Sequence, residues 1–129
     1  MLLAFALLGI GLAMARGVDL PAADFLMKPA PAPRALMIDG PVTHVRDGDT
    51  IEVRGTPVRI ANLDCAERGT ADGAEATFRM IEIAQKGPML CRLEGRKSWD
   101  REVGVCALPD GRDIGEILIS EGTCDRWQG

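Results

Sequence analysis

Alternating apolar and polar residues between positions 38 and 61 constrain the fold of this chain more than any other feature. The runs GPVTHVR, TIEVR and PVRIANL each alternate, with Asp47-Gly48 and Gly55-Thr56 between them as turn signals. Period-two alternation is typical of strands that bury one face, and short turns join strands that are neighbours in a sheet. The sequence therefore predicts a three-stranded meander.

The apolar pattern changes period after this segment. Thr70 can cap a helix, apolar residues then recur at helical spacing at Ala74, Phe78 and Ile81, and Lys86-Gly87 ends the run. Met80 and Ile83 join this apolar set. We therefore expect a helix over residues 70–86.

Two short apolar runs, MLCRL and VGVCAL, follow this helix and suit antiparallel strands, and the turn PDGR precedes DIGEILISEG, which predicts a short helix ended by Gly122. The predicted order is three strands, a helix, two strands and a helix. This order is that of an OB-type five-stranded barrel, a mainly β fold with helices (α+β).

The N-terminal part differs in composition. Residues 1–15 carry no charge and end in Ala13-Met14-Ala15, which is typical of a signal peptide and predicts export to the periplasm or outside the cell. An uncleaved membrane anchor is the second interpretation, because fifteen residues fall short of the ~20 that span a bilayer; a start site elsewhere is the third. Residues 16–37 are Pro-rich and predict a linker, so the domain is expected over residues 38–129.

Charge and cysteine content narrow the function classes. The chain has 15 Lys and Arg against 19 Asp and Glu, a net charge of −4, so any nucleic-acid site must be local. Cys65, Cys91, Cys106 and Cys124 match no zinc spacing, and His44 is the single histidine. We interpret His44 as a strand residue without a catalytic role, and we expect disulfides if the chain is exported.

Acidic residues cluster at the predicted strand ends. Asp47 and Asp49 lie where strand one turns into strand two, and Asp64 and Glu67 lie just past strand three. These positions fall at one end of a meander, where carboxylates could meet around a hard cation such as Ca²⁺. Alternatively, Asp-Gly-Asp is only a solvated turn. Arg59, on strand three, could supply a planar guanidinium for phosphate at the same end of the sheet.

The run DGDTIEV…VRIANLDCAE resembles the signature of the thermonuclease family, the staphylococcal-nuclease-like domains. Similarity to the two helices of that family continues through GAEATFRMI and DGRDIGEILISEG, so the resemblance covers residues 40–122. It implies Ca²⁺-dependent hydrolysis of phosphodiester bonds in DNA and RNA. The ion would be held by Asp49, Asp64 and the backbone carbonyl of Cys65. Glu67 would be the general base and Arg59 the first phosphate-binding arginine.

The family's second arginine can be placed in two registers of SWDREVGVC. One leaves Gly104 in the catalytic position and implies an inactive enzyme; the other, which we prefer, matches Trp99-Asp100-Arg101 and assigns the role to Arg101. The preferred register also places Cys91 and Cys106 on paired hairpin strands, where relatives carry a disulfide. Cys65 and Cys124 are left open between a second disulfide and free thiols.

The chain departs from the family pattern at several positions. Ala66 replaces a proline, and Asp100 replaces a glycine, which is expected to place a repulsive charge beside the phosphate site. There is no Tyr, so Trp99 and Trp127 are the remaining candidates for stacking on bases. The sequence ends at Gly129, where the family begins its C-terminal helix, so we expect a domain that lacks this helix.

Three functions remain open at this stage. The first is a monomeric nuclease that acts on single-stranded DNA or RNA, without stable membrane insertion after processing. The second is a weakened or inactive OB-fold module that binds nucleic acid or a protein partner. The third is a structural domain stabilised by Ca²⁺.

Overall fold

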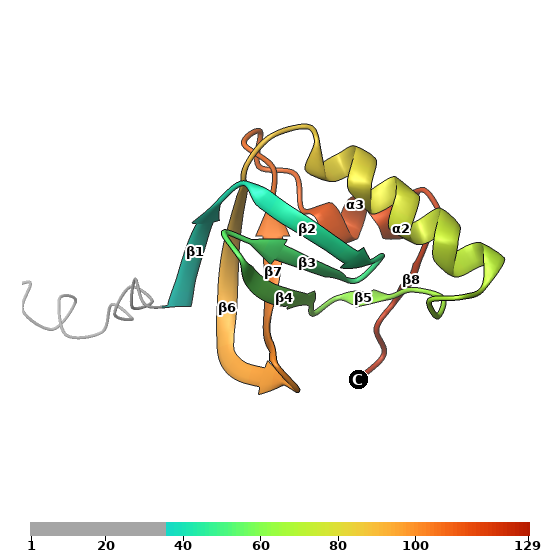
Figure 1. Cartoon of the computed structure of the whole chain (residues 1–129), viewed down its shortest axis with the longest axis horizontal. Coiled ribbons are helices and arrows are strands. Elements are labelled where there is room, and N and C mark those ends of the chain that lie inside the picture. The colour runs from blue at the N-terminus through green and yellow to red at the C-terminus, as the bar shows by residue number, and fades with distance from the viewer. Residues whose placement is uncertain (1–35) are drawn as a thin grey trace, which may run out of the picture. The chain divides into compact units, whose positions relative to one another are not determined.

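The computed structural model describes residues 36–129, which form an α+β fold dominated by strands (Figure 1). The predicted leader, residues 1–15, and all but the end of the predicted linker, residues 16–37, lie outside the described residues. The strands are β1 (Met37–Gly40), β2 (Val42–Asp47), β3 (Thr50–Val53), β4 (Thr56–Ile60), β5 (Leu63–Asp64), β6 (Met89–Ser98), β7 (Arg101–Ala107) and β8 (Asp125–Arg126). The helices are α2 (Ala71–Ala84) and α3 (Ile114–Ser120).

Six strands form the main sheet in the order β1-β6-β7-β4-β3-β2. The predicted meander is β2, β3 and β4, which pair antiparallel, while β4 and β7 pair parallel. Only Pro41 separates β1 from β2, although these strands are the two ends of the order. The remaining strands, β5 and β8, form a separate two-stranded sheet.

Helix α2 begins where the sequence predicts. The Thr70 side chain accepts a hydrogen bond from the Gly73 amide, which satisfies one of the free donors of the first turn. The buried face is formed by Gly73, Ala76, Met80 and Ile83, whereas Phe78 is 63% exposed. The helix carries two apolar stripes, and the one that includes Ala76 packs on the core. The helical spacing of apolar residues therefore predicted the helix correctly but did not show which of its two apolar stripes is buried.

Helix α3 is capped by Asp113, which accepts from the Glu116 amide, and the chain turns away at Gly122 with a φ of 76°, as the sequence predicts. Its buried residues Ile114 and Leu118 join a core built from aliphatic side chains of β3, β4, α2 and β6. No helix among residues 36–129 has the length and apolar character needed to cross a bilayer.

Two disulfides are present. Cys91 and Cys106 lie at directly paired positions of β6 and β7 and are bonded, so the pairing predicted from the resemblance is confirmed. Cys65 and Cys124, which the sequence left open, are also bonded. Disulfides in a small domain are typical of an oxidising environment.

Candidate functional site

The turn between β2 and β3 places its acidic residues at the end of β4. The Asp47 carboxylate accepts a hydrogen bond from the Asp49 amide at 3.1 Å, a local contact that favours a tight turn. The Ile60 amide donates to the Asp49 carbonyl at 2.8 Å, and Thr50 pairs with Arg59 across the two strands. Because of this register, Asp49 lies beside Arg59.

Two arginines are joined through a carboxylate and a hydroxyl. Arg59 Nη2 lies 3.4 Å from Asp49 Oδ2, and the Thr50 hydroxyl donates to Asp49 Oδ1 at 3.2 Å. That hydroxyl in turn accepts from Arg101 Nη1 at 3.0 Å. Thr50 is 1% exposed, so a buried polar group has both of its bonds satisfied by site residues. The structure thus brings Arg59, Asp49 and Arg101 together.

Burial shapes the electrostatics of Asp49. Loss of solvent raises the pKa of its carboxyl to about 6, and the hydrogen bond with the Asp47 carboxyl acts in the same direction. The positive charge of Arg59 opposes both effects without cancelling them. Asp49 is therefore a half-buried carboxylate whose lost hydration is not fully compensated by the guanidinium of Arg59.

Arg59 is fixed by further contacts. Its guanidinium donates to the carbonyl of Ile60 and, at 2.8 Å, to the carbonyl of Leu63, and its Cζ lies 5.9 Å from the centroid of the Trp127 ring. The chain turns at residues 61–62, so β5 folds back toward the arginine. This turn brings the segment after β4 within hydrogen-bonding distance of Arg59.

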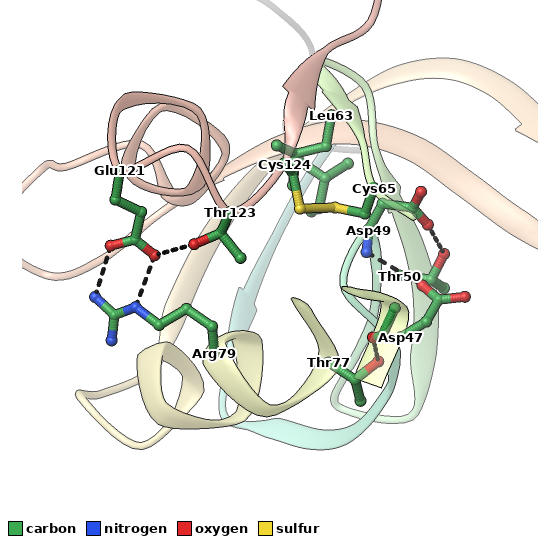
Figure 2. Close-up of a disulfide and its surroundings, with 12 residues drawn as sticks. Asp47, Asp49, Thr50, Leu63, Cys65, Thr77, Arg79, Glu121, Thr123 and Cys124 are labelled. Carbon is green, nitrogen blue, oxygen red and sulfur yellow. Dashed lines mark hydrogen bonds and ion pairs between the residues drawn. A yellow bond between two sulfur atoms is a disulfide. The ribbon is translucent and has the colours of Figure 1, made fainter. Parts of the chain in front are cut away.

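The segment that follows β5 packs against the acidic turn. A side-chain carbon built at Gly48 would lie 3.0 Å from Cys65 Sγ, so the backbone of Gly48 packs directly against the Cys65 side chain. Figure 2 shows Cys65 and its disulfide next to Asp49. Asp64 and Glu67 stand on either side of Cys65 in sequence, and both are exposed.

The backbone of Glu67 is held at the start of α2. Its carbonyl accepts from the Thr70 hydroxyl at 2.7 Å and from the Thr70 amide at 3.2 Å. A side chain at Gly73 would collide with this carbonyl, so the helix approaches as closely as glycine allows. The Glu67 backbone is anchored while its carboxylate faces solvent.

A cleft of about 270 Å³ adjoins the arginines, and we call it the arginine cleft. Its lining residues are Arg59, Ala61, Arg96, Ser98, Arg101, Val103 and Trp127. Every charged residue in this lining is an arginine. The cleft can accept an anion such as a phosphate, since planar guanidinium groups pair with its oxygens.

A second hollow, the tip pocket, lies at the β6–β7 turn and has a volume of about 210 Å³. Trp99, at the tip, is 91% exposed with a φ of 60°, an uncommon conformation for a bulky residue. The lining residues of the tip pocket are Arg46, Asp47, Thr50, Arg68, Trp99, Asp100 and Arg101. Arg101 therefore contributes to both hollows.

The repulsive charge expected from Asp100 is compensated. Its two carboxylate oxygens accept from Arg46 at 3.2 and 3.0 Å. The hydrogen bonds from Arg46 hold the pKa of the Asp100 carboxyl below its ordinary value. No local pattern indicates this pair, because its partners are 54 positions apart.

Sequence reasoning missed three residues of this site. Arg96 lines the arginine cleft, Thr50 links the two arginines, and Arg46 neutralises Asp100. Arg96 and Ser98 lie two positions apart on β6 and therefore on one face, which is a signal that alternation could have provided. Thr50 and Arg46 act through contacts between distant parts of the chain.

The residues proposed as cation ligands can be compared with what Ca²⁺ requires. Within residues 36–129 no group of three His, Cys, Asp or Glu side chains is arranged to hold a metal. The expected donors are two carboxylates, Asp49 and Asp64, and one backbone carbonyl, at Cys65. The half-buried Asp49 fits such a cation in kind, because a positive ion beside the carboxylate would offset the loss of solvent that raises its pKa.

Comparison with known proteins gives partial matches. No protein-family model matches the chain. The chain is 33% identical, over an 89-residue alignment, to the succinoglycan biosynthesis protein ExoI of Rhizobium meliloti, covering 60% of this chain and 47% of that protein. It is 28% identical to proteins named uncharacterized endonuclease from Escherichia coli O157:H7 and Escherichia coli, covering 66% of this chain and 58% of each. The chain spans about half the length of the curated relatives it matches.

Proposed function

We propose that this chain is a nuclease of the thermonuclease type, which hydrolyses phosphodiester bonds in DNA or RNA and depends on Ca²⁺. The observation that supports it most is the arginine cleft, where Arg59 and Arg101 are linked through Asp49 and Thr50. Two relatives that carry the word endonuclease in their names support the same reading. The thermonuclease-like spacing of the acidic residues supplies the type.

In this proposal the two arginines bind the phosphate that is cleaved. Arg59 and Arg101 line one cleft, so both can contact non-bridging oxygens of a single phosphoryl group. Negative charge builds on these oxygens as water attacks the phosphorus, and fixed guanidinium groups stabilise that charge without reorganising. The contacts of Arg59 with Ile60 and Leu63 keep it in place before the substrate arrives.

Glu67 takes the role of general base. Its backbone is anchored by Thr70 while its side chain reaches solvent, so it can accept a proton from an attacking water. Asp49, Asp64 and the Cys65 carbonyl would hold the cation. When bound, a divalent cation supplies Lewis-acid stabilisation of the phosphoryl oxygens.

We further propose that the domain is an OB-type barrel. The strand order and the helix between β5 and β6 support this, as does the continuity of β1 and β2 through Pro41. A single bent strand that pairs with β6 through one half and β3 through the other would bring the two ends of the sheet together. The loops at one rim would then form the cleft.

Single-stranded nucleic acid is the proposed substrate, and an oxidising compartment outside the cytoplasm is the proposed location. Exposed aromatic rings beside the arginines, Trp99 and Trp127, support a substrate with unpaired bases. The two disulfides support the location.

The test uses the full chain with both disulfides formed. Cleavage of single-stranded DNA is measured with Ca²⁺ and with a chelator, for the wild type and for Glu67→Gln, Arg59→Ala and Arg101→Ala. Each variant is expected to lose on the order of 10²-fold or more in kcat, the scale for one transition-state donor. Arg92→Ala is the matched control, because Arg92 is an exposed arginine on β6 outside both hollows.

Chelator-resistant cleavage, or cleavage that survives in Glu67→Gln, would contradict the proposal. The alternative is a module that binds nucleic acid without cleaving it. It is favoured by the way Arg59 already bonds to Asp49 and two backbone carbonyls. Binding of single-stranded DNA by the wild type without cleavage at any Ca²⁺ concentration would select this alternative.

A further inference from the structure

The aromatic side chains of residues 36–129 all lie on the surface. They are Phe78, Trp99 and Trp127, with exposed fractions of 63%, 91% and 52%. Aromatic residues usually contribute much of a protein core, yet the core here is aliphatic. Keeping three rings in water has a cost in hydrophobic free energy, so a surface role needs to be sought for each.

Each ring lines a different hollow, and neighbouring hollows share arginines. The arginine cleft contains Trp127 and shares Arg101 with the tip pocket. The tip pocket shares Arg46 and Arg68 with a third hollow, which lies between β2 and α2. The three hollows therefore form a continuous row on the surface, with the tip pocket in the middle. Each pair of neighbouring hollows shares at least one arginine.

The third hollow, here called the β2–α2 groove, is the one that no role has yet explained. It has a volume of about 440 Å³ and contains Phe78 with Ile81, Ala74 and Val45 as apolar neighbours. The charged residues in its lining, Arg46 and Arg68, are both basic, although the chain as a whole has a net charge of −4. A ligand for this groove should offer a flat apolar group and a negative charge.

Arg68 differs from Arg46 in its availability. Arg46 contacts Asp100 and Glu52, whereas Arg68 makes no ion pair with any residue of the described part of the chain. Arg68 follows Glu67 directly in sequence and lines both the tip pocket and the groove. Its positive charge can meet a phosphate close to the one that is cleaved.

We propose that the β2–α2 groove is an accessory binding subsite for single-stranded nucleic acid, in which a base stacks on Phe78 and a phosphate contacts Arg68. This inference rests on the proposed function, since the nucleic acid in the groove would be part of the same molecule whose scissile phosphate lies in the arginine cleft. Junction arginines keep the backbone in contact with positive charge from one hollow to the next. A nucleic-acid strand fits this arrangement better than a peptide does, because its negative charges and flat rings alternate along the chain.

The experiment compares a short and a long ligand. Binding is measured with Glu67→Gln protein, in the full chain with disulfides formed, to a dinucleotide and to an oligothymidylate of about 12 nucleotides, within the ~4–16 that OB folds occupy. Adding Phe78→Ala is expected to weaken binding of the long ligand at least about fivefold, which is the lower end of the range for one stacked base. Binding of the dinucleotide should stay unchanged. Phe78→Trp should restore binding of the long ligand.

Leu90→Ala is the matched control. Leu90 is 51% exposed, lies on β6 and lines a different hollow, so its loss should alter neither ligand. Thermal unfolding of each variant checks that the fold is intact. The subsite proposal is overturned if Phe78→Ala weakens the binding of both ligands, or of neither.

Arg68→Gln gives an independent measurement. The slope of log binding constant against log salt concentration should become shallower by about 0.7, the value for one phosphate contact on a single strand. Arg112→Gln, which changes an exposed arginine paired with Asp110, should leave the slope unchanged. An unchanged slope in Arg68→Gln contradicts the phosphate contact.

Failure of the subsite and failure of the nuclease proposal give different results. If protein with Glu67 intact cleaves nothing but Phe78→Ala still weakens only the long ligand, the subsite stands and the nuclease proposal falls. If the dinucleotide and the long ligand are cleaved and Phe78→Ala affects neither, the nuclease stands and the subsite falls. Absence of binding to every oligonucleotide overturns the subsite and would leave the groove to a protein partner.

Discussion

The Cys91–Cys106 disulfide joins two long strands that already pair residue by residue, whereas Cys65–Cys124 joins two segments that have little else between them. Six paired positions connect β6 and β7, and both sulfurs lie in the core. By contrast, β5 and β8 pair at only two positions, next to which Cys65 and Cys124 lie (Figures 1 and 2). The first disulfide reinforces an extensive pairing of strands, whereas the second reinforces a pairing of only two positions.

This difference matters because the second region carries the candidate site. Asp64 and Glu67 flank Cys65, and the segment after Cys124 carries Trp127, which lies against Arg59. The main sheet positions Arg59, Asp49 and Arg101, and the disulfide joins the segment that carries Asp64 and Glu67 to the segment that carries Trp127. The comparison therefore separates a disulfide that serves stability from one that serves stability and site geometry together.

The largest effect is expected from removing the second disulfide. In Cys65→Ala/Cys124→Ala, which opens a loop with a sequence separation of 59, the free energy of unfolding should fall by about 4 kcal/mol on the loop-entropy estimate. The kcat/KM of the folded protein should fall at least about tenfold, because a small displacement of catalytic groups is costly. Denaturant unfolding and nuclease assays below the unfolding transition measure the two effects.

Removing the first disulfide should affect stability with little effect on activity. In Cys91→Ala/Cys106→Ala the free energy of unfolding should fall by about 3 kcal/mol, as for a loop of roughly fifteen residues. The kcat/KM of the folded fraction should stay within about twofold, since β6 and β7 keep their pairing through backbone hydrogen bonds. Equal losses of activity in both double variants would break the comparison.

The half-buried carboxyl of Asp49 gives the site region its own dependence on pH. Its pKa is raised to about 6 in the folded protein, so the folded state binds more protons than the unfolded state between about pH 4 and 6. The stability of the wild type should therefore fall as pH rises through this window, by on the order of 2 kcal/mol relative to Asp49→Asn. Urea unfolding at a series of pH values measures this difference, and parallel profiles would contradict it.

Gly48→Ala should produce a smaller effect that depends on which disulfide is present. The new carbon would lie 2.8 Å from Ala76 Cβ and 3.0 Å from Cys65 Sγ, so overpacking should cost about 1–2 kcal/mol. Part of this cost should vanish in the Cys65→Ala/Cys124→Ala background and none in the Cys91→Ala/Cys106→Ala background. A double-mutant cycle in each background makes the comparison, and equal costs would show that Cys65 does not pack on the acidic turn.

Elements with a strong local pattern could be predicted from the sequence. The strands β2, β3 and β4 alternate over several residues, and α2 has both a capping threonine and an apolar period. The small sheet of β5 and β8 was missed, because two residues are too few to show a period. The sequence also did not reveal that Phe78 lies on the exposed side of α2. The helix has two apolar stripes, and only the packing of the whole domain decides which one is buried.

The same distinction applies to the candidate site. The ion pair of Asp49 with Arg59 joins the turn after β2 to β4, and the sequence placed these elements next to each other in one meander. The bridge from Thr50 to Arg101 and the pair between Arg46 and Asp100 join residues more than fifty positions apart. Such contacts depend on the packing of β7 against β4, which no local pattern specifies.

The exposure of both tryptophans has a practical consequence. Trp99 and Trp127 are the chain's two tryptophans, and both stand in water beside the arginines in the folded state. Neither ring belongs to the core, so their intrinsic fluorescence reports on the surroundings of the cleft and the β6–β7 turn and not on core packing. Stacking of a base should quench it, and the molecule thus carries its own optical readout of occupancy at the cleft.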